Sequence, residues 1–159
     1  MNTIFLGLGA NIGNKEKQLE QAIDQLNSHD HLEVTQIADF KSFKADLPAK
    51  FVSQPDYLNT VIECMTLLSP EELFEYTQKI EISLGRQSKG DFQPRSIDID
   101  ILFYNQDIIS KDTLIIPHAR LHERVFVLQP MMQIAPYFMH PVFQKTIKEL
   151  YLEQNDHTD

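Results

Sequence analysis

The sequence has few of the features that mark secreted, membrane-spanning or nucleic-acid-binding proteins. Its single cysteine, Cys64, excludes an internal disulfide and a cysteine-rich zinc site. Lysine and arginine number 14 against 23 aspartates and glutamates, and this net charge of −9 argues against duplex nucleic acid as the main partner. No apolar run approaches the ~20 residues of a membrane span, and the first residues lack the basic start of a signal peptide. We therefore expect a cytoplasmic protein that binds neither membranes nor nucleic acid.

The composition is that of an ordinary globular chain. Of the 159 residues, 42% are hydrophobic and 23% are charged, which is enough apolar content to bury a core. We expect one domain over residues 1–152 and a loose acidic tail over residues 153–159. We expect a monomer, with a weak dimer as the alternative.

One stretch, residues 94–104, combines a strong strand pattern with acidic side chains. Its strict alternation places Asp98 and Asp100 on one face of a strand and the intervening isoleucines on the other. Two close carboxylates repel each other and need a neutralising partner, and Mg²⁺ commonly binds one or two carboxylates together with substrate phosphates. The alternative is a half-buried strand whose polar face is simply solvated.

Arginine is concentrated around this strand, whereas the ten lysines are spread from end to end. The four arginines of the chain are Arg86, Arg95, Arg120 and Arg124. Because the guanidinium group suits bidentate recognition of phosphate, this distribution suggests chemistry on a nucleotide.

The remaining periodicity predicts further strands and helices. Asn14 is a candidate cap for a helix with an apolar face, and Ser69 and Glu72 form a capping box for a second helix that ends at Gly85. The predicted strands are residues 3–8, 32–43 and 57–68, a hairpin pairs 108–109 with 114–116, and later helices cover 123–134 and 146–152. Aperiodic loops are expected at 44–55 and 88–93.

The first six of these elements run strand–helix–strand–strand–helix–strand. This order is the ferredoxin-like split βαβ pattern. We therefore predict an α+β fold, with a mostly antiparallel sheet and helices packed on it.

Several local motifs together resemble one family, the 6-hydroxymethyl-7,8-dihydropterin pyrophosphokinases of folate biosynthesis. The matching motifs are Tyr57-Leu58-Asn59, Glu81, Gly85-Arg86, Pro94-Arg95-Ser96-Ile97-Asp98-Ile99-Asp100-Ile101, Ile116-Pro117-His118 and Glu123-Arg124-Val125-Phe126. The resemblance runs from about residue 3 to residue 136, and Pro-Arg-x-x-Asp-x-Asp is its most specific part. It implies transfer of pyrophosphate from ATP to the hydroxymethyl group of the pterin, with release of AMP.

The resemblance also implies roles for individual residues. Asp98 and Asp100 would hold two Mg²⁺ ions, Asp98 would help to orient the pterin alcohol, and Arg86 and Arg95 would meet the charge that develops during transfer. The expected ATP contacts are Gln78, Glu81, Lys89, Ile101, His118 and Arg124. The expected pterin contacts are Tyr57, Asn59, Phe92 and Phe126.

The loops depart from the family pattern. Residues 44–48 lack the usual Thr-x-Pro-like motif, Phe92 replaces a tryptophan, and Ser88 stands where an arginine is common. A first alternative is therefore a divergent paralogue that binds nucleotide or pterin with weak or altered transfer. A second alternative is a ferredoxin-like interaction domain whose acidic pair is only surface.

Overall fold

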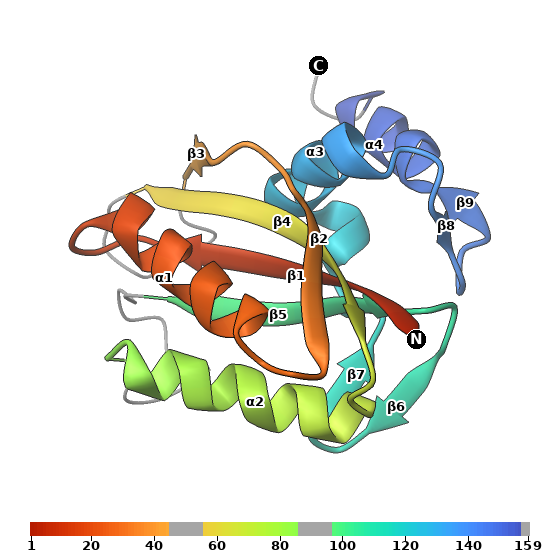
Figure 1. Cartoon of the computed structure of the whole chain (residues 1–159). Helices are drawn as coiled ribbons and strands as arrows, with labels where there is room; N and C mark the ends of the chain where they lie inside the picture. Colours follow the sequence, from red (N-terminus) through yellow and green to blue (C-terminus); the bar gives the residue numbers. More distant parts are fainter. Residues whose placement is uncertain (45–55, 86–96, 157–159) are drawn as a thin grey trace.

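An antiparallel sheet forms the centre of the molecule and carries helices on both faces (Figure 1). The structure, a computed structural model, describes residues 1–44, 56–85 and 97–156. In chain order the elements are β1 (Asn2–Ala10), α1 (Lys15–Asn27), β2 (Leu32–Ile37), β3 (Lys41–Phe43), β4 (Tyr57–Thr66), α2 (Pro70–Ser83), β5 (Asp98–Tyr104), β6 (Ile109–Lys111), β7 (Leu114–Ile116), the 3₁₀ turn η1 (Leu121–Glu123), α3 (Val125–Ile134), β8 (Met139–His140), β9 (Lys145–Thr146) and α4 (Ile147–Asp156).

The strand order confirms the predicted fold class. The main sheet runs β2-β4-β1-β5, with β3 also paired to β4, and every neighbouring pair is antiparallel. This is the ferredoxin-like arrangement, in which each strand–helix–strand unit leaves a gap that a strand of the other unit fills. The strand β5 is consequently at one edge of the sheet.

Each face of the sheet has its own apolar core. Leucines and isoleucines of β1, β4 and β5 pack under α1 and α2 on one face. On the other face, aromatic rings pack with α3 and α4, and the Phe138 ring centroid lies 4.9 Å from that of Phe5 and 4.7 Å from that of Phe103. Cys64 is fully buried, and burial, together with the charge of Glu63, raises the pKa of its thiol to about 12.

The predicted helix ends of α1 and α2 are confirmed. The Asn14 side chain accepts a hydrogen bond from the Lys17 amide at the start of α1. Ser69 and Glu72 form both hydrogen bonds of the capping box at the start of α2, and Gly85 follows its end with φ of +103°. These local signals need only neighbouring residues, which is why the sequence predicts them well.

The predicted strand over residues 32–43 is wrong in one respect, because it is divided into β2 and β3. Between them, the Thr60 hydroxyl donates to the Ala38 carbonyl at 2.8 Å, and the Ala38 amide donates to the Val61 carbonyl. The buried Thr60 side chain on β4 therefore occupies the Ala38 carbonyl, which in a continuous strand would accept from a backbone amide of the neighbouring strand.

Two features near the C-terminus also differ from the prediction. The short strands β8 and β9 form a hairpin that no periodicity indicated, since each has two residues. The last helix continues to Asp156, four residues past its predicted end at Leu152. Thr146 and Glu149 cap its start through reciprocal hydrogen bonds, and Lys145 pairs with Glu153 one turn further on.

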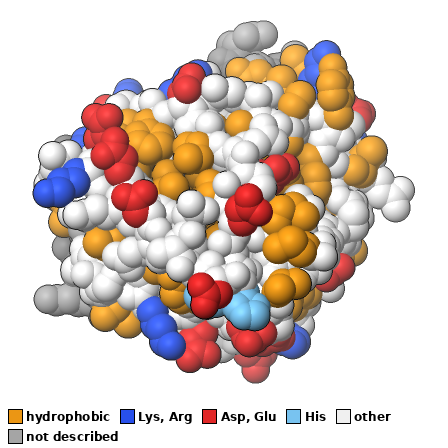
Figure 2. All heavy atoms as spheres, viewed as in Figure 1, with side chains coloured by type: hydrophobic (Ala, Val, Ile, Leu, Met, Phe, Trp, Pro, Cys, Tyr) orange, Lys and Arg blue, Asp and Glu red, His pale blue; other side chains and the backbone are white. Residues whose placement is uncertain are grey.

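The surface agrees with the acidic composition. Acidic side chains are spread over the face of the molecule that Figure 2 shows instead of gathering in one place. Within residues 1–44, 56–85 and 97–156, no helix is both long enough and apolar enough to span a membrane.

Candidate functional site

The two aspartates of β5 point to the same face of the sheet, as the alternation predicted. Asp98 and Asp100 are half-buried, while Ile99 and Ile101 are buried in the core beneath α1 and α2. The isoleucines therefore anchor the strand, and the carboxylates lie on the opposite face.

Glycines lie opposite both aspartates on the neighbouring strand. Gly9 of β1 pairs with Asp98, and Gly7 pairs with Asp100. Neither glycine has a side chain, so nothing from β1 covers the carboxylates at these two positions. A Cβ atom on Gly9 would lie 2.6 Å from the Asn59 side-chain nitrogen, which shows how closely the Asn59 amide lies over the backbone of β1.

The carboxylate pair fits a hard divalent cation. Carboxylate oxygens are the donors that Mg²⁺ prefers, and a site with two of them leaves coordination positions for phosphate oxygens and water. In the described part of the chain, no group of three or more histidine, cysteine, aspartate or glutamate side chains forms a protein-only metal cage. The geometry therefore suits an ion that is shared with a ligand.

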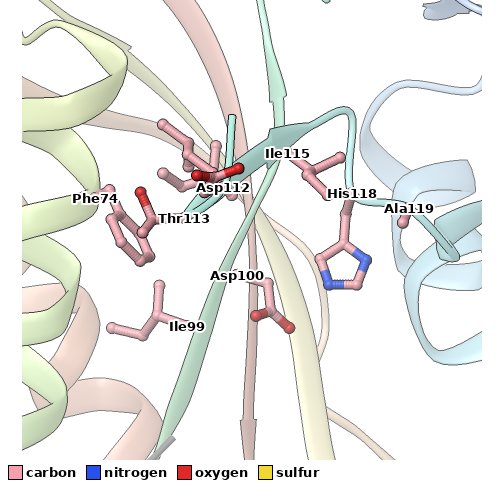
Figure 3. A pocket seen from close by; sticks show the side chains of 10 residues that line it. Phe74, Ile99, Asp100, Asp112, Thr113, Ile115, His118 and Ala119 are labelled. Carbon is pink, nitrogen blue, oxygen red and sulfur yellow. The ribbon is translucent and has the colours of Figure 1, made fainter. Parts of the chain in front are cut away.

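A cavity of about 320 Å³ lies beside Asp100, along the outer edge of β5. In Figure 3 the Asp100 carboxylate and the His118 ring both project into it, with Phe74 and Ile99 on its other side. The His118 amide donates to the Leu102 carbonyl at 3.2 Å, which ties the segment after β7 to the strand of the aspartates. The full lining is Phe74, Ile99, Asp100, Ile101, Asp112, Thr113, Leu114, Ile115, His118 and Ala119.

Polar and aromatic side chains gather at the start of β4, the strand on the other side of β1 from β5. Tyr57 and Asn59 lie two residues apart, so they share one face of the strand. Asn59 is 7% exposed, and its buried Oδ1 has no hydrogen-bond partner among the described residues. Because a buried acceptor without a partner is costly, this oxygen is a candidate contact for a ligand that donates a hydrogen bond.

The start of α3 brings Arg124 and Phe126 to the same region. The Arg124 guanidinium lies 5.4 Å from the centre of the Phe126 ring, and the Phe43 ring lies 6.4 Å from Phe126. Phe43 is paired with Tyr57 between β3 and β4. Phe43 was not among the predicted site residues, since an aromatic residue at a strand end is a weak signal by itself.

Glu81, which was predicted to contact ATP, is buried between α2 and β5. Its side chain is 2% exposed, and Oε2 accepts a hydrogen bond from the Ile99 amide at 2.8 Å. Gln78, one turn earlier on α2, is half-buried. Neither residue belongs to the lining of the cavity beside Asp100.

Four predicted site residues, Arg86, Lys89, Phe92 and Arg95, lie outside the described residues. Apart from Gln78 and Glu81 on α2, the other predicted residues fall into two groups, one at β5 and one at the start of β4. Asp98, Asp100 and Ile101 belong to β5, and His118 lines the same cavity as Asp100 and Ile101. Tyr57, Asn59, Arg124 and Phe126 lie at the starts of β4 and α3.

A ferredoxin-like sheet with paired carboxylates beside a ligand-sized cavity defines a class of small-molecule-binding α+β domain. Comparison with known proteins narrows this class. A model of the family 7,8-dihydro-6-hydroxymethylpterin-pyrophosphokinase (HPPK) matches residues 5–136. This chain belongs to that family.

Individual relatives agree with this assignment. The 2-amino-4-hydroxy-6-hydroxymethyldihydropteridine pyrophosphokinase of Bacillus subtilis (strain 168) is 40% identical over 133 residues, covering 84% of this chain and 78% of the relative. The protein of the same name from Aquifex aeolicus (strain VF5) is 36% identical over 149 residues, covering 94% and 90%. The predicted family and enzyme class are therefore confirmed.

Solved structures show the same fold. A Plasmodium falciparum HPPK-DHPS chain superposes with a TM-score of 0.74 at 14% identity, over 96% of this chain and 45% of that chain. This chain thus spans less than half the length of that protein, and at this identity the likeness concerns the fold alone.

Proposed function

We propose that this chain transfers pyrophosphate from ATP to the hydroxymethyl group of 6-hydroxymethyl-7,8-dihydropterin and releases AMP. The observation that carries the proposal is the pair of carboxylates, Asp98 and Asp100, on one face of β5 beside a ligand-sized cavity. Family membership and the printed names of the relatives supply the reaction and the substrate class.

The alcohol oxygen of the pterin attacks the β-phosphorus of ATP. A new oxygen–phosphorus bond forms, and the bond from that phosphorus to the oxygen bridging the α-phosphate breaks. AMP leaves with the bridging oxygen, and the proton of the alcohol passes to solvent. The reaction depends on in-line positioning and on neutralisation of charge more than on a strong base.

Asp98 and Asp100 would hold two Mg²⁺ ions against the triphosphate. When bound, such ions neutralise the phosphate charge and stabilise the attacking and departing oxygens. Asp98, nearer the pterin-side residues of β4, also orients the alcohol. The open face beside Gly7 and Gly9 gives the phosphates room to approach both carboxylates.

The nucleotide occupies the edge of β5, and the pterin occupies the region of Tyr57 and Asn59. His118 contacts a phosphate beside Asp100, which lines the same cavity. The Asn59 Oδ1 accepts from the donor edge of the pterin, and the Phe126 ring stacks on it. Arg124, together with Arg86, Lys89 and Arg95, supplies positive charge to a chain whose net charge is −9.

The decisive test measures AMP release from ATP, Mg²⁺ and 6-hydroxymethyl-7,8-dihydropterin. We expect Asp98→Asn and Asp100→Asn to lower turnover by about 100-fold or more, because each removes a charged oxygen ligand. Asp107→Asn, the same substitution in the exposed turn after β5, is the matched control and should retain full turnover.

Full activity in either aspartate variant would refute the metal role. A wild-type chain that binds ATP without releasing AMP would instead indicate a divergent paralogue. An ATP affinity that does not respond to Mg²⁺ would favour the interaction-domain alternative.

A further inference from the structure

We propose that Glu81 is a positioning residue for the two aspartates. By holding the Ile99 amide, its carboxylate would set the direction in which Asp98 and Asp100 leave the strand. This inference rests on the proposed function, since it takes these aspartates as ligands of the metal ions.

The position of β5 at the edge of the sheet makes such a contact necessary. Among the described residues the strand pairs with β1 on one side only, so no described strand accepts from the alternate amides on its other side. The amide of Ile99, the residue between the two aspartates, is one of these. It donates to Glu81 Oε2 at 2.8 Å.

The helix that carries Glu81 is firmly held against the sheet. Leu73, Thr77 and Ile80 of α2 are buried, and Ile80 belongs to the same core as Ile99. The Glu81 side chain is itself 2% exposed. A buried carboxylate on an anchored helix has little freedom to move away from the amide that it accepts from.

Burying a carboxylate costs free energy, even when the carboxylate accepts a hydrogen bond from an edge strand. Desolvation disfavours the charged form, whereas a charge-assisted hydrogen bond is about twice as strong as a neutral one. The contact lies at the one residue of β5 that both aspartates flank. Rotation of the peptide at Ile99 would turn both carboxylates, and metal sites tolerate misplacement of only ~0.5 Å.

A second buried hydrogen bond on β5 allows a positioning role of Glu81 to be distinguished from a purely structural one. The Tyr104 hydroxyl, at the far end of β5, donates to the Leu68 carbonyl. Tyr104→Phe therefore removes a buried hydrogen bond from β5 without touching the peptide between the aspartates. It is the matched control for Glu81→Leu.

The experiment measures Mn²⁺ binding by electron paramagnetic resonance in the presence of α,β-methylene-ATP, whose α–β linkage cannot be cleaved. Amide hydrogen exchange at Ile99 is followed by NMR in the same proteins. We expect Glu81→Leu to raise the Kd for Mn²⁺ about 10-fold and to accelerate exchange at Ile99 by at least about 10-fold, as loss of a partner behind a metal ligand does.

Glu81→Gln keeps an acceptor oxygen at the same reach, so its Kd for Mn²⁺ should stay within about threefold of wild type. Tyr104→Phe should lower the stability of the fold and leave the Kd for Mn²⁺ unchanged. If Glu81→Leu does not fold, Glu81→Asp carries the same expectation, because it retains the charge but falls short of the Ile99 amide.

Wild-type binding of Mn²⁺ by Glu81→Leu, or equal losses in Glu81→Leu and Tyr104→Phe, would overturn the inference. So would a Glu81→Gln variant as weak as Glu81→Leu, or an Ile99 amide that exchanges freely in the wild type. The proposed function has a separate test, since it fails only if the wild-type chain does not release AMP.

Discussion

At the scale of single residues, the two glycines of β1 matter as much to the site as the aspartates that they face. Gly9 lies between Asp98 on β5 and Asn59 on β4, which are its partners on the two sides. Any side chain there would project from the same face as the proposed metal ligands and pterin contacts. Because both glycines lack a side chain, only backbone atoms of β1 lie beside the two aspartates at these positions.

We predict that Gly9→Ala raises the KM for the pterin by about 10-fold. The new Cβ would lie 2.6 Å from the Asn59 amide nitrogen and 3.3 Å from Tyr57 Cδ1, so it displaces two predicted pterin contacts. A displacement of this size commonly costs up to about 100-fold in rate. Steady-state kinetics with either substrate varied separate the pterin effect from the ATP effect.

Gly7→Ala is the matched control for that variant. Its Cβ would meet only the Leu102 side chain among its nearest atoms, at 3.4–3.6 Å, which is ordinary packing distance. The KM for the pterin should stay within about threefold. An equal change in both variants would mean that the sheet, and not Asn59, responds to the added methyl group.

At the scale of elements, α2 connects a local capping signal with a tertiary contact to the strand of the aspartates. It begins at the Ser69 and Glu72 capping box and, three turns later, supplies Glu81 to the Ile99 amide. The Ser69 amide donates to the Glu72 carboxylate and, with a smaller contribution from the Ser69 side chain, lowers the pKa of that carboxyl group. The stabilisation from this pair is therefore present above the ordinary carboxyl pKa and is lost as the pH falls through the lowered one.

Ser69→Ala should lower the free energy of unfolding by about 1 kcal/mol, since it leaves the Glu72 amide without its capping acceptor. Urea denaturation at pH 7 measures the change. The same substitution at the last residue of the helix, Ser83→Ala, is the control and should change the free energy by less than about 0.5 kcal/mol. Equal costs at both ends would contradict a specific role for the cap.

At the scale of the whole molecule, the β8–β9 hairpin closes the core beneath α3 and α4. His140 in this hairpin is 3% exposed, packs edge-on against Phe103 of β5, and lies beside the Phe143 ring. Its Nδ1 accepts from the amides of Val142 and Phe143. Burial, with a smaller contribution from His122, lowers the pKa of His140 from 6.5 to about 4.

This histidine predicts how stability depends on pH. Between pH 6.5 and about pH 4 the unfolded chain binds a proton at His140 that the folded chain does not, so folding weakens as the pH falls through this window. We expect the free energy of unfolding to decrease by about 2 kcal/mol from pH 7 to pH 5 through this group. Urea denaturation at both values measures the decrease.

His140→Asn supplies the control, because asparagine retains an acceptor for the two amides and does not titrate in this range. Its stability should fall by about 2 kcal/mol less than that of the wild type between pH 7 and pH 5. The same loss in both proteins would assign the pH dependence to other groups.

The elements with short-range causes were predictable from the sequence. Capping residues identified the starts of α1 and α2, and strict alternation placed Asp98 and Asp100 on one face, because these patterns depend on neighbours in the chain. The order of the first six elements was enough to predict the fold class. The motifs also identified the family.

Three features were decided only by the tertiary structure, because each depends on residues that are far apart in the chain or belong to different elements. The division between β2 and β3 depends on Thr60, and the short hairpin β8–β9 is stabilised by the core that it covers. The contact from Glu81 to Ile99 joins residues from two elements, and no local pattern indicates that the carboxylate is buried. Chain neighbours determine which face of a strand a side chain occupies, whereas the partner of a buried polar group is determined only when the sheet and its helices have assembled.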